Sequence, residues 1–187
     1  MKKSQVWVET AIYTLIGLTI IAIVLSTAMP QIEKIKQRSI VKQTYNALIE
    51  LNNEIQKVEQ VAGNIKIVYF KIAKGKLEIN SSGNKIIYTL ENTNLKFSEP
   101  GKRIEQENII LETQEYGRRF NIILELDLNS SLDLTYNGED KTKVLHAGAS
   151  PYKILIENVG VEEIGDKMRI DFRVGWKVKW SAIILKK

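Results

Sequence analysis

Residues 10–29 read TAIYTLIGLTIIAIVLSTAM, a run of twenty residues without one charged side chain. As an α-helix rising about 1.5 Å per residue, this run would be roughly 30 Å long, which matches the hydrocarbon core of a bilayer. Helices buried in soluble domains are seldom apolar on every face. The stretch from Thr10 to Met29 therefore predicts a membrane-spanning helix.

A helical pattern continues beyond Pro30. Apolar residues recur mostly at gaps of three and four, which is the spacing of one helix face. They are Ile32, Ile35, Val41, Tyr45, Leu48, Ile55, Val58 and Ala62. Pro30 predicts a kink rather than an end, and Gly63-Asn64 provides residues that tolerate a left-handed cap. We expect one helix from Gln5 to Ala62, with a membrane half at residues 5–29 and an amphipathic half at residues 30–62.

The period of the apolar pattern changes to two after the helix, which predicts strands. Ser81-Ser82-Gly83-Asn84 separates two of these strands and predicts a hairpin with a four-residue loop. The expected strands are Ile65 to Lys74, Lys76 to Asn80, Lys85 to Leu90, Asn108 to Gln114, Arg119 to Asp127, Leu132 to Tyr136, Tyr152 to Val159 and Met168 to Val174. The predicted fold class is α+β, with the long helix packed on an antiparallel β-sheet or small β-sandwich at residues 65–187.

Composition and motifs argue against an enzyme. The chain has 187 residues, no cysteine and a net charge of +5 from 27 basic and 22 acidic residues that are interspersed, so nucleic acid is not an expected partner. His146, the single histidine, has no nucleophile motif near it. Residues 127–133 resemble a calcium loop, but Leu132 stands where glycine is needed. We predict no catalytic residues, no metal and no cofactor.

Two surface features remain in the β-rich part. Arg169, Arg173, Lys177 and Lys179 share one parity, with Trp176 and Trp180 on the other. Because Asp171 lies within this basic strip, a solvated strand face opposite a core is favoured over an anion-binding surface. Asn80 and Asn129 each begin an Asn-Ser-Ser sequon in a predicted turn, which makes them candidate N-glycosylation sites.

The amino terminus is compatible with three kinds of processing. A secretory signal peptide would use Lys2 and Lys3 as its basic region and be cut after Ala28, which leaves a soluble exported binding protein. An uncut span would give a monomeric membrane-anchored surface domain. In the third interpretation the span is retained after a short leader is removed. Glu9 is the lone acid beside the apolar run, and an ionisable group there usually has a partner or a role.

The sequence MKKS followed by QVWVE resembles the amino terminus of type IV pilins, in particular archaeal pilins with a short class III signal peptide. In that family a membrane aspartyl prepilin peptidase cuts on the cytoplasmic side, and the mature chain has glutamate as its fifth residue. The resemblance implies that residues 1–4 are a leader, that the cut lies between Ser4 and Gln5, and that Glu9 is the fifth mature residue. Two features depart from the family: Ser4 replaces the usual glycine or alanine, and no cysteine is present for a carboxyl-terminal disulfide.

The resemblance also implies a function and partners. The chain would be a structural subunit of a surface filament or a secretion or adhesion pseudopilus, and the new amino group of Gln5 would pair with Glu9 of a neighbouring subunit. The implied partners are the membrane, the prepilin peptidase, copies of itself or other pilins, and indirectly an assembly ATPase and platform. The amino terminus would be cytoplasmic and residues 65–187 outside the cell, where sequons are often glycosylated. The lysines and arginines at positions 34–42 favour the opposite orientation by the positive-inside rule.

Overall fold

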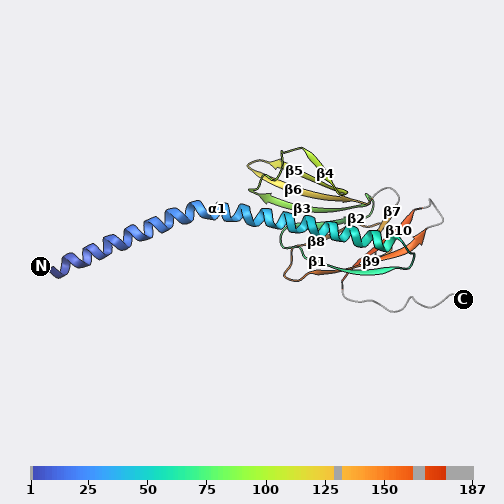
Figure 1. Ribbon diagram of the computed structural model, residues 1–187, viewed down its shortest axis with the longest axis horizontal. Helices are drawn as coiled ribbons and strands as arrows, with labels where there is room; N and C mark the ends of the chain where they lie inside the picture. The colour runs from blue at the N-terminus through green and yellow to red at the C-terminus, as the bar shows by residue number, and fades with distance from the viewer. Residues whose placement is uncertain (1, 129–131, 162–166, 176–187) are drawn as a thin grey trace. The chain divides into compact units, whose positions relative to one another are not determined.

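A computed structural model describes residues 2–128, 132–161 and 167–175, and it has the expected α+β fold (Figure 1). The chain begins with one long helix, α1 (Lys2–Glu59), and continues as strands. In chain order the strands within the described ranges are β1 (Ile65–Phe70), β2 (Lys76–Asn80), β3 (Lys85–Thr93), β4 (Arg103–Gln106), β5 (Ile109–Tyr116), β6 (Arg119–Asp127), β7 (Leu132–Tyr136), β8 (Lys143–His146), β9 (Tyr152–Val161) and β10 (Met168–Val174).

Helix α1 is continuous through Pro30, so proline does not end it. The chain divides into two compact units, residues 1–39 and residues 40–187, and α1 contributes to both. The helix ends at Glu59, three residues before the predicted end at Ala62. Gly63 follows with a φ of 81°, a left-handed conformation in which a side chain would be strained.

The strands form two sheets in the second unit. The four-stranded sheet has the order β1-β9-β10-β7, and the six-stranded sheet has the order β4-β5-β6-β3-β2-β8. Neighbouring strands are antiparallel apart from β7 and β10, which run parallel. This pair is the one exception, among the described strands, to the expected antiparallel arrangement. Parallel neighbours need a long connection, and here the connection from β7 to β10 passes through β8 and β9.

The predicted hairpin joins β2 to β3 through a four-residue turn. Asn80 pairs with Lys85, and the Asn84 amide donates to the carbonyl oxygen of Ser81 at 3.0 Å. Asn84 has a φ of 51°, which asparagine tolerates better than most residues. Its side-chain oxygen accepts a hydrogen bond from the amide of Leu134 in β7 at 2.8 Å. One turn residue thus links the two sheets.

The carboxyl-terminal half of α1 packs into the same hydrophobic core as both sheets. In Figure 1 this half of the helix is seen between the two sheets, and its buried side chains belong to one apolar cluster with theirs. The helix contributes Val41, Leu48, Leu51, Ile55 and Val58, all at most 1% exposed. Four of these were predicted from the helical spacing. Ile32 and Ile35 of the same predicted stripe are instead exposed.

Eight predicted strands are present, four of them with the predicted ends and four with shifted ends, and two strands of the described residues were not predicted. Both missed strands, β4 and β8, are four residues long and lie at the two edges of the six-stranded sheet. β4 is exposed at every residue, and Ile104 is its one apolar side chain. Strands of four residues are too short to show a clear two-residue period, and an edge strand need not bury a whole face.

Candidate functional site

The most unusual surface of the described chain is the amino-terminal part of α1. Its large apolar side chains are exposed rather than buried in a core: Trp7 is 79% exposed and Leu15 is 66% exposed. By length and composition, α1 is the one helix among the described residues that could cross a membrane. Contiguous exposed apolar surface of this kind marks a membrane or an interaction site.

Hydroxyl groups interrupt the apolar segment, and four of them donate to main-chain carbonyl oxygens of the same helix. Thr14 donates to the carbonyl oxygen of Thr10 at 2.8 Å, and Thr19 donates to that of Leu15 at 2.7 Å. Ser26 and Thr27 both donate to the carbonyl of Ile23, at 2.8 and 3.3 Å. In hydrocarbon, polar groups must find partners within the protein. These hydroxyls meet that condition without water or a second chain.

Glu9 is the charged residue at the beginning of this surface. Between Ser4 and Ile32 no other side chain carries a formal charge. The Tyr13 hydroxyl lies 3.4 Å from Glu9 Oε1, one helical turn further along the same face, and donates a weak hydrogen bond. One donor leaves most of the hydrogen-bonding capacity of a carboxylate available to another group.

The predicted cleavage bond between Ser4 and Gln5 lies inside α1, as does the predicted span from Thr10 to Met29. The side chains of Ser4 and Gln5 lie outside the described part. Gln5 and Glu9 are four positions apart on one helix, which puts them on the same face about 6 Å apart along the axis. The cut and the Gln5–Glu9 pairing both remain predictions.

The carboxyl-terminal end of α1 is held by a side chain that sequence reasoning missed. Asn158 of β9 is fully buried, and its Nδ2 donates to the carbonyl oxygens of Val58 and Glu59 at 3.0 and 3.1 Å. The last carbonyls of a helix have no partner within the helix. The Asn158 main chain also exchanges hydrogen bonds with Gly63 and Asn64, at 2.8 and 3.0 Å. The end of the helix is therefore fixed to the sheet.

The basic strip is neutralised where it is described. Arg169 Nε lies 2.9 Å from Asp133 Oδ2, and Arg173 lies 2.8 Å from carboxylates of both Glu157 and Asp171. Asp171 is fully buried, so the expectation that it belongs to a solvated face is wrong. It also accepts bonds from Thr135 and Gly138, at 2.9 and 2.7 Å, and a buried carboxylate needs such donors. Lys177, Lys179, Trp176 and Trp180 lie outside the described residues.

The remaining candidates form no reaction centre. His146 is exposed at the end of strand β8. Asn80 is the last residue of β2, beside the β2–β3 turn, and its Oδ1 accepts the Gly83 amide at 3.0 Å. Asn129 lies outside the described residues. Within the described ranges, no group of acidic or histidine side chains could hold a metal ion.

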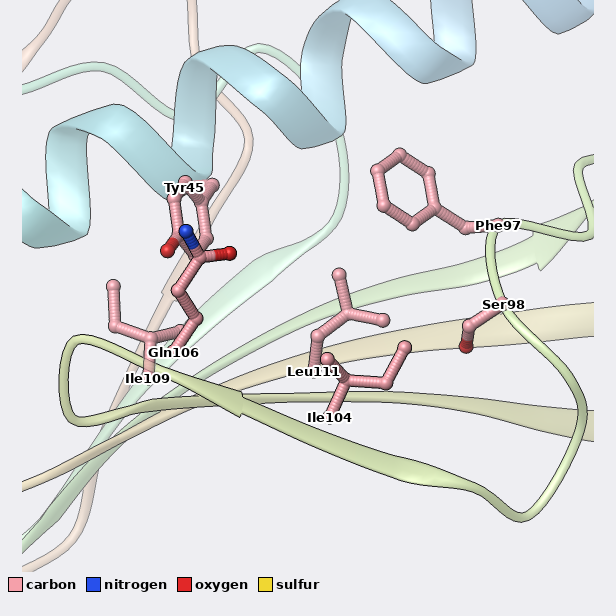
Figure 2. A pocket seen from close by; sticks show the side chains of 7 residues that line it. All are labelled: Tyr45, Phe97, Ser98, Ile104, Gln106, Ile109 and Leu111. Carbon is pink, nitrogen blue, oxygen red and sulfur yellow. The ribbon is translucent and has the colours of Figure 1, made fainter.

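A cavity of about 150 Å³ lies beneath α1 (Figure 2). Tyr45 of the helix points toward Gln106 and Ile109 of the β4–β5 hairpin, and most of the lining is apolar. The Tyr45 hydroxyl is buried without a hydrogen-bond partner. Burial, and secondarily the nearby Glu107 carboxylate, raises the pKa of Tyr45. This lining has no convergent polar groups of the kind that fix a bound ligand.

The exposed apolar helix with Glu9 near its start is thus the best candidate for a functional surface. Comparisons of the chain with family models, with curated proteins and with solved structures find no match.

Proposed function

We propose that this chain is a pilin-like structural subunit, which a prepilin peptidase processes between Ser4 and Gln5. The mature subunit resides in the membrane through residues 5–29 and then assembles with copies of itself or other pilins into a surface filament or pseudopilus. The observation that carries the proposal is the lone carboxylate of Glu9, at the beginning of an apolar stretch of α1 whose large side chains are exposed.

The exposed helix surface is suited to two environments in succession, first lipid and then a bundle of neighbouring helices. The hydroxyls of Thr14 and Thr19 are bonded within the helix, so they need no outside polar partner in lipid or in a bundle of similar helices. Transfer from one apolar environment to the other involves little change in hydration. The helix would therefore serve first as a membrane anchor and then as the core of a filament.

Glu9 supplies the specificity that apolar packing lacks. Cleavage would give Gln5 a new α-amino group, which has a pKa of roughly 7.7–8.0 in water and is cationic at neutral pH. When one member of a buried ion pair is removed, the charge that remains destabilises the assembly by about 3–5 kcal/mol. Pairing of the two groups between neighbouring subunits would favour one axial register over the others.

The amino terminus of the native protein tests the processing step. We expect mass spectrometry of the membrane or filament fraction to find Gln5 as the first residue. A chain that begins at Met29 would show an exported soluble protein, and an intact Met1 would show an uncut anchor. Either result overturns the proposal.

Substitution of the acid tests the assembly step. We expect Glu9→Gln to leave the Gln5 terminus unchanged but to abolish filaments in electron micrographs, because the buried pair loses its anion. Glu50→Gln is the matched control, since Glu50 is an exposed acid of the same helix beyond the apolar run, and its filaments should be normal. Normal filaments from Glu9→Gln would contradict the role assigned to Glu9.

A further inference from the structure

Three cations follow the apolar segment of α1. Lys34, Lys36 and Arg38, which we call the basic cluster, lie five to nine residues beyond Met29, on a helix that is continuous through Pro30. All three side chains are exposed. Among the described residues, none of the three has a hydrogen bond or an ion pair. The basic cluster therefore presents unpaired positive charge just past the predicted span.

Acidic neighbours are scarce on this part of the helix. Glu33 is the one acid between Glu9 and Glu50, and its Oε1 accepts a hydrogen bond from Gln37 Nε2 at 3.1 Å rather than from a cation. In the β-rich unit several lysines and arginines instead form ion pairs with carboxylates, at 2.6 to 2.9 Å. The counter-charge for the basic cluster therefore comes from solvent or from a partner.

The basic cluster lies near the lipid headgroups when residues 10–29 span a bilayer. With a rise of about 1.5 Å per residue, Lys34 is about 7.5 Å and Arg38 about 13.5 Å beyond Met29 along the axis. A headgroup layer extends roughly 5–8 Å beyond the hydrocarbon on each side. Side chains on a helix tilt toward its amino terminus, which here is the direction of the membrane. The long stems of lysine and arginine can therefore bring all three charges back to the phosphate layer.

The three cations lie on opposite sides of the helix. At about 100° per residue, Lys34 and Arg38 differ by roughly 40° around the axis, and Lys36 lies roughly 160° from both. A neighbouring protein surface contacts one side of a helix, whereas headgroups surround a single span completely. Each cation near an anionic membrane surface strengthens association by about fivefold. The arrangement therefore favours lipid over a one-sided protein partner.

We propose that the basic cluster binds the phosphate headgroups of anionic lipids in the leaflet that contains Met29. The bound lipids hold the subunit at one depth while it resides in the membrane. This role accounts for cations on the outer side, where the positive-inside rule does not expect them. The inference rests on the membrane-resident stage of the proposed function, but not on cleavage or filament assembly.

Lipid selectivity at the end of the span tests the proposal. Because the chain lacks cysteine, Ser26→Cys can carry a single small fluorophore near the basic cluster in the full chain, reconstituted into phosphatidylcholine vesicles. Quenching by nitroxide-labelled phosphatidylglycerol is compared with quenching by nitroxide-labelled phosphatidylcholine, which gives the relative association constant of the anionic lipid. We expect a preference for the anionic lipid of at least about fivefold in about 0.1 M salt. The preference should disappear in about 1 M salt, where the Debye length falls from about 10 Å to about 3 Å.

Removal of the three charges locates the preference. The cluster variant, which combines Lys34→Gln, Lys36→Gln and Arg38→Gln, should abolish it at position 26 and leave the lipid ratio at a Thr10→Cys probe, at the opposite end of the span, unchanged. The control variant removes the same net charge from three exposed cations of the β-rich unit and should keep the preference; it combines Lys96→Gln, Lys102→Gln and Arg118→Gln. Circular dichroism checks that both variants are folded. A preference that survives in the cluster variant, or that is lost equally in the control variant, would overturn the proposal.

The remaining outcomes separate this inference from filament assembly. If the unmodified chain shows no lipid preference and the cluster variant forms no filaments, the cations bind acids of a neighbouring subunit and the lipid proposal is wrong. If neither lipid quenches the probe, residues 10–29 do not enter the bilayer, which overturns this inference and the membrane stage of the proposed function together. A normal lipid preference in a chain that forms no filaments would support this inference and contradict assembly alone.

Discussion

Replacing Asn158 should loosen the end of helix α1 from the sheet. In Asn158→Ala the carbonyls of Val58 and Glu59 lose their donor, and the Gly160 amide loses the Oδ1 acceptor at 2.9 Å. Each lost hydrogen bond reduces the net free energy of unfolding by about 1 kcal/mol, so the three together give about 3 kcal/mol. For a chain of this size, that corresponds to a fall in Tm of roughly 6–12 °C. The main-chain bonds of residue 158 would remain.

The charge of the replacement makes the prediction sharper. Asn158→Asp keeps the acceptor for Gly160 but sets a carboxylate about 3 Å from two carbonyl oxygens at the negative end of the helix. Burial and these oxygens would raise the pKa of the introduced carboxyl above its value of about 3.9 in the unfolded chain. At pH 7 this variant should therefore be less stable than Asn158→Ala. The deficit should shrink as the pH falls toward 4, because the folded state then binds the extra proton more readily.

Thermal unfolding of the full chain in detergent, followed by far-ultraviolet circular dichroism, measures both variants. Asn53→Ala is the control, since Asn53 is an exposed asparagine on the same helix, and its effect should be within about 0.5 kcal/mol. Hydrogen exchange at residues 58–64 should increase in Asn158→Ala ahead of exchange in the sheets. If Asn158→Asp is as stable as Asn158→Ala at pH 7, Asn158 does not act as the helix cap described above.

Three further predictions concern the core. Burial raises the pKa of Tyr88 to about 12 against about 10 when unfolded, so its contribution is complete below pH 10 and about 2–3 kcal/mol is lost between pH 10 and 12; Tyr88→Phe should flatten that part of the pH–stability curve. Tyr45→Phe removes a hydroxyl without a partner and should be neutral or stabilising by up to about 1 kcal/mol in chemical denaturation. In Gly75→Ala the new Cβ would overlap the Thr89 carbonyl oxygen, so the Tm of this variant should be well below that of Gly101→Ala, where φ is similar and no atom lies near the new Cβ.

The helix was predictable along its length but not at its end. Apolar spacing identified Val41, Leu48, Ile55 and Val58 as buried, because a continuous 3.6-residue period extends through them. The end at Glu59 depends on Asn158, about a hundred residues away, and no local signal connects the two. The same limit explains the parallel β7–β10 pair, since strand partners distant in sequence are chosen by tertiary packing.

At the candidate site the apolar run was recognised from the sequence, whereas the burial of Asp171 was not. The apolar run and Glu9 were recognisable in the sequence, because a run of twenty uncharged residues with one acid before it is a feature of composition alone. Asp171 misled the strand analysis: alternation implied a solvated position, but the residue is buried among donors from Thr135, Gly138 and Arg173. Two-residue periodicity distinguishes faces by polarity and cannot recognise a buried polar network.

Ile32 and Ile35 extend the exposed apolar surface of α1 beyond Pro30. Both continue the apolar pattern past Pro30, yet they are 46% and 68% exposed, while the stripe from Val41 onward is buried in the core of the second unit. Charged residues flank them at positions 33, 34 and 36, so hydrocarbon is an unfavourable environment for this turn. An apolar pair between charged neighbours is instead suited to a contact with another protein surface, where the charges remain at a wet rim. In the proposed filament, packing of α1 against neighbouring subunits would therefore extend beyond the membrane-spanning residues and include Ile32 and Ile35.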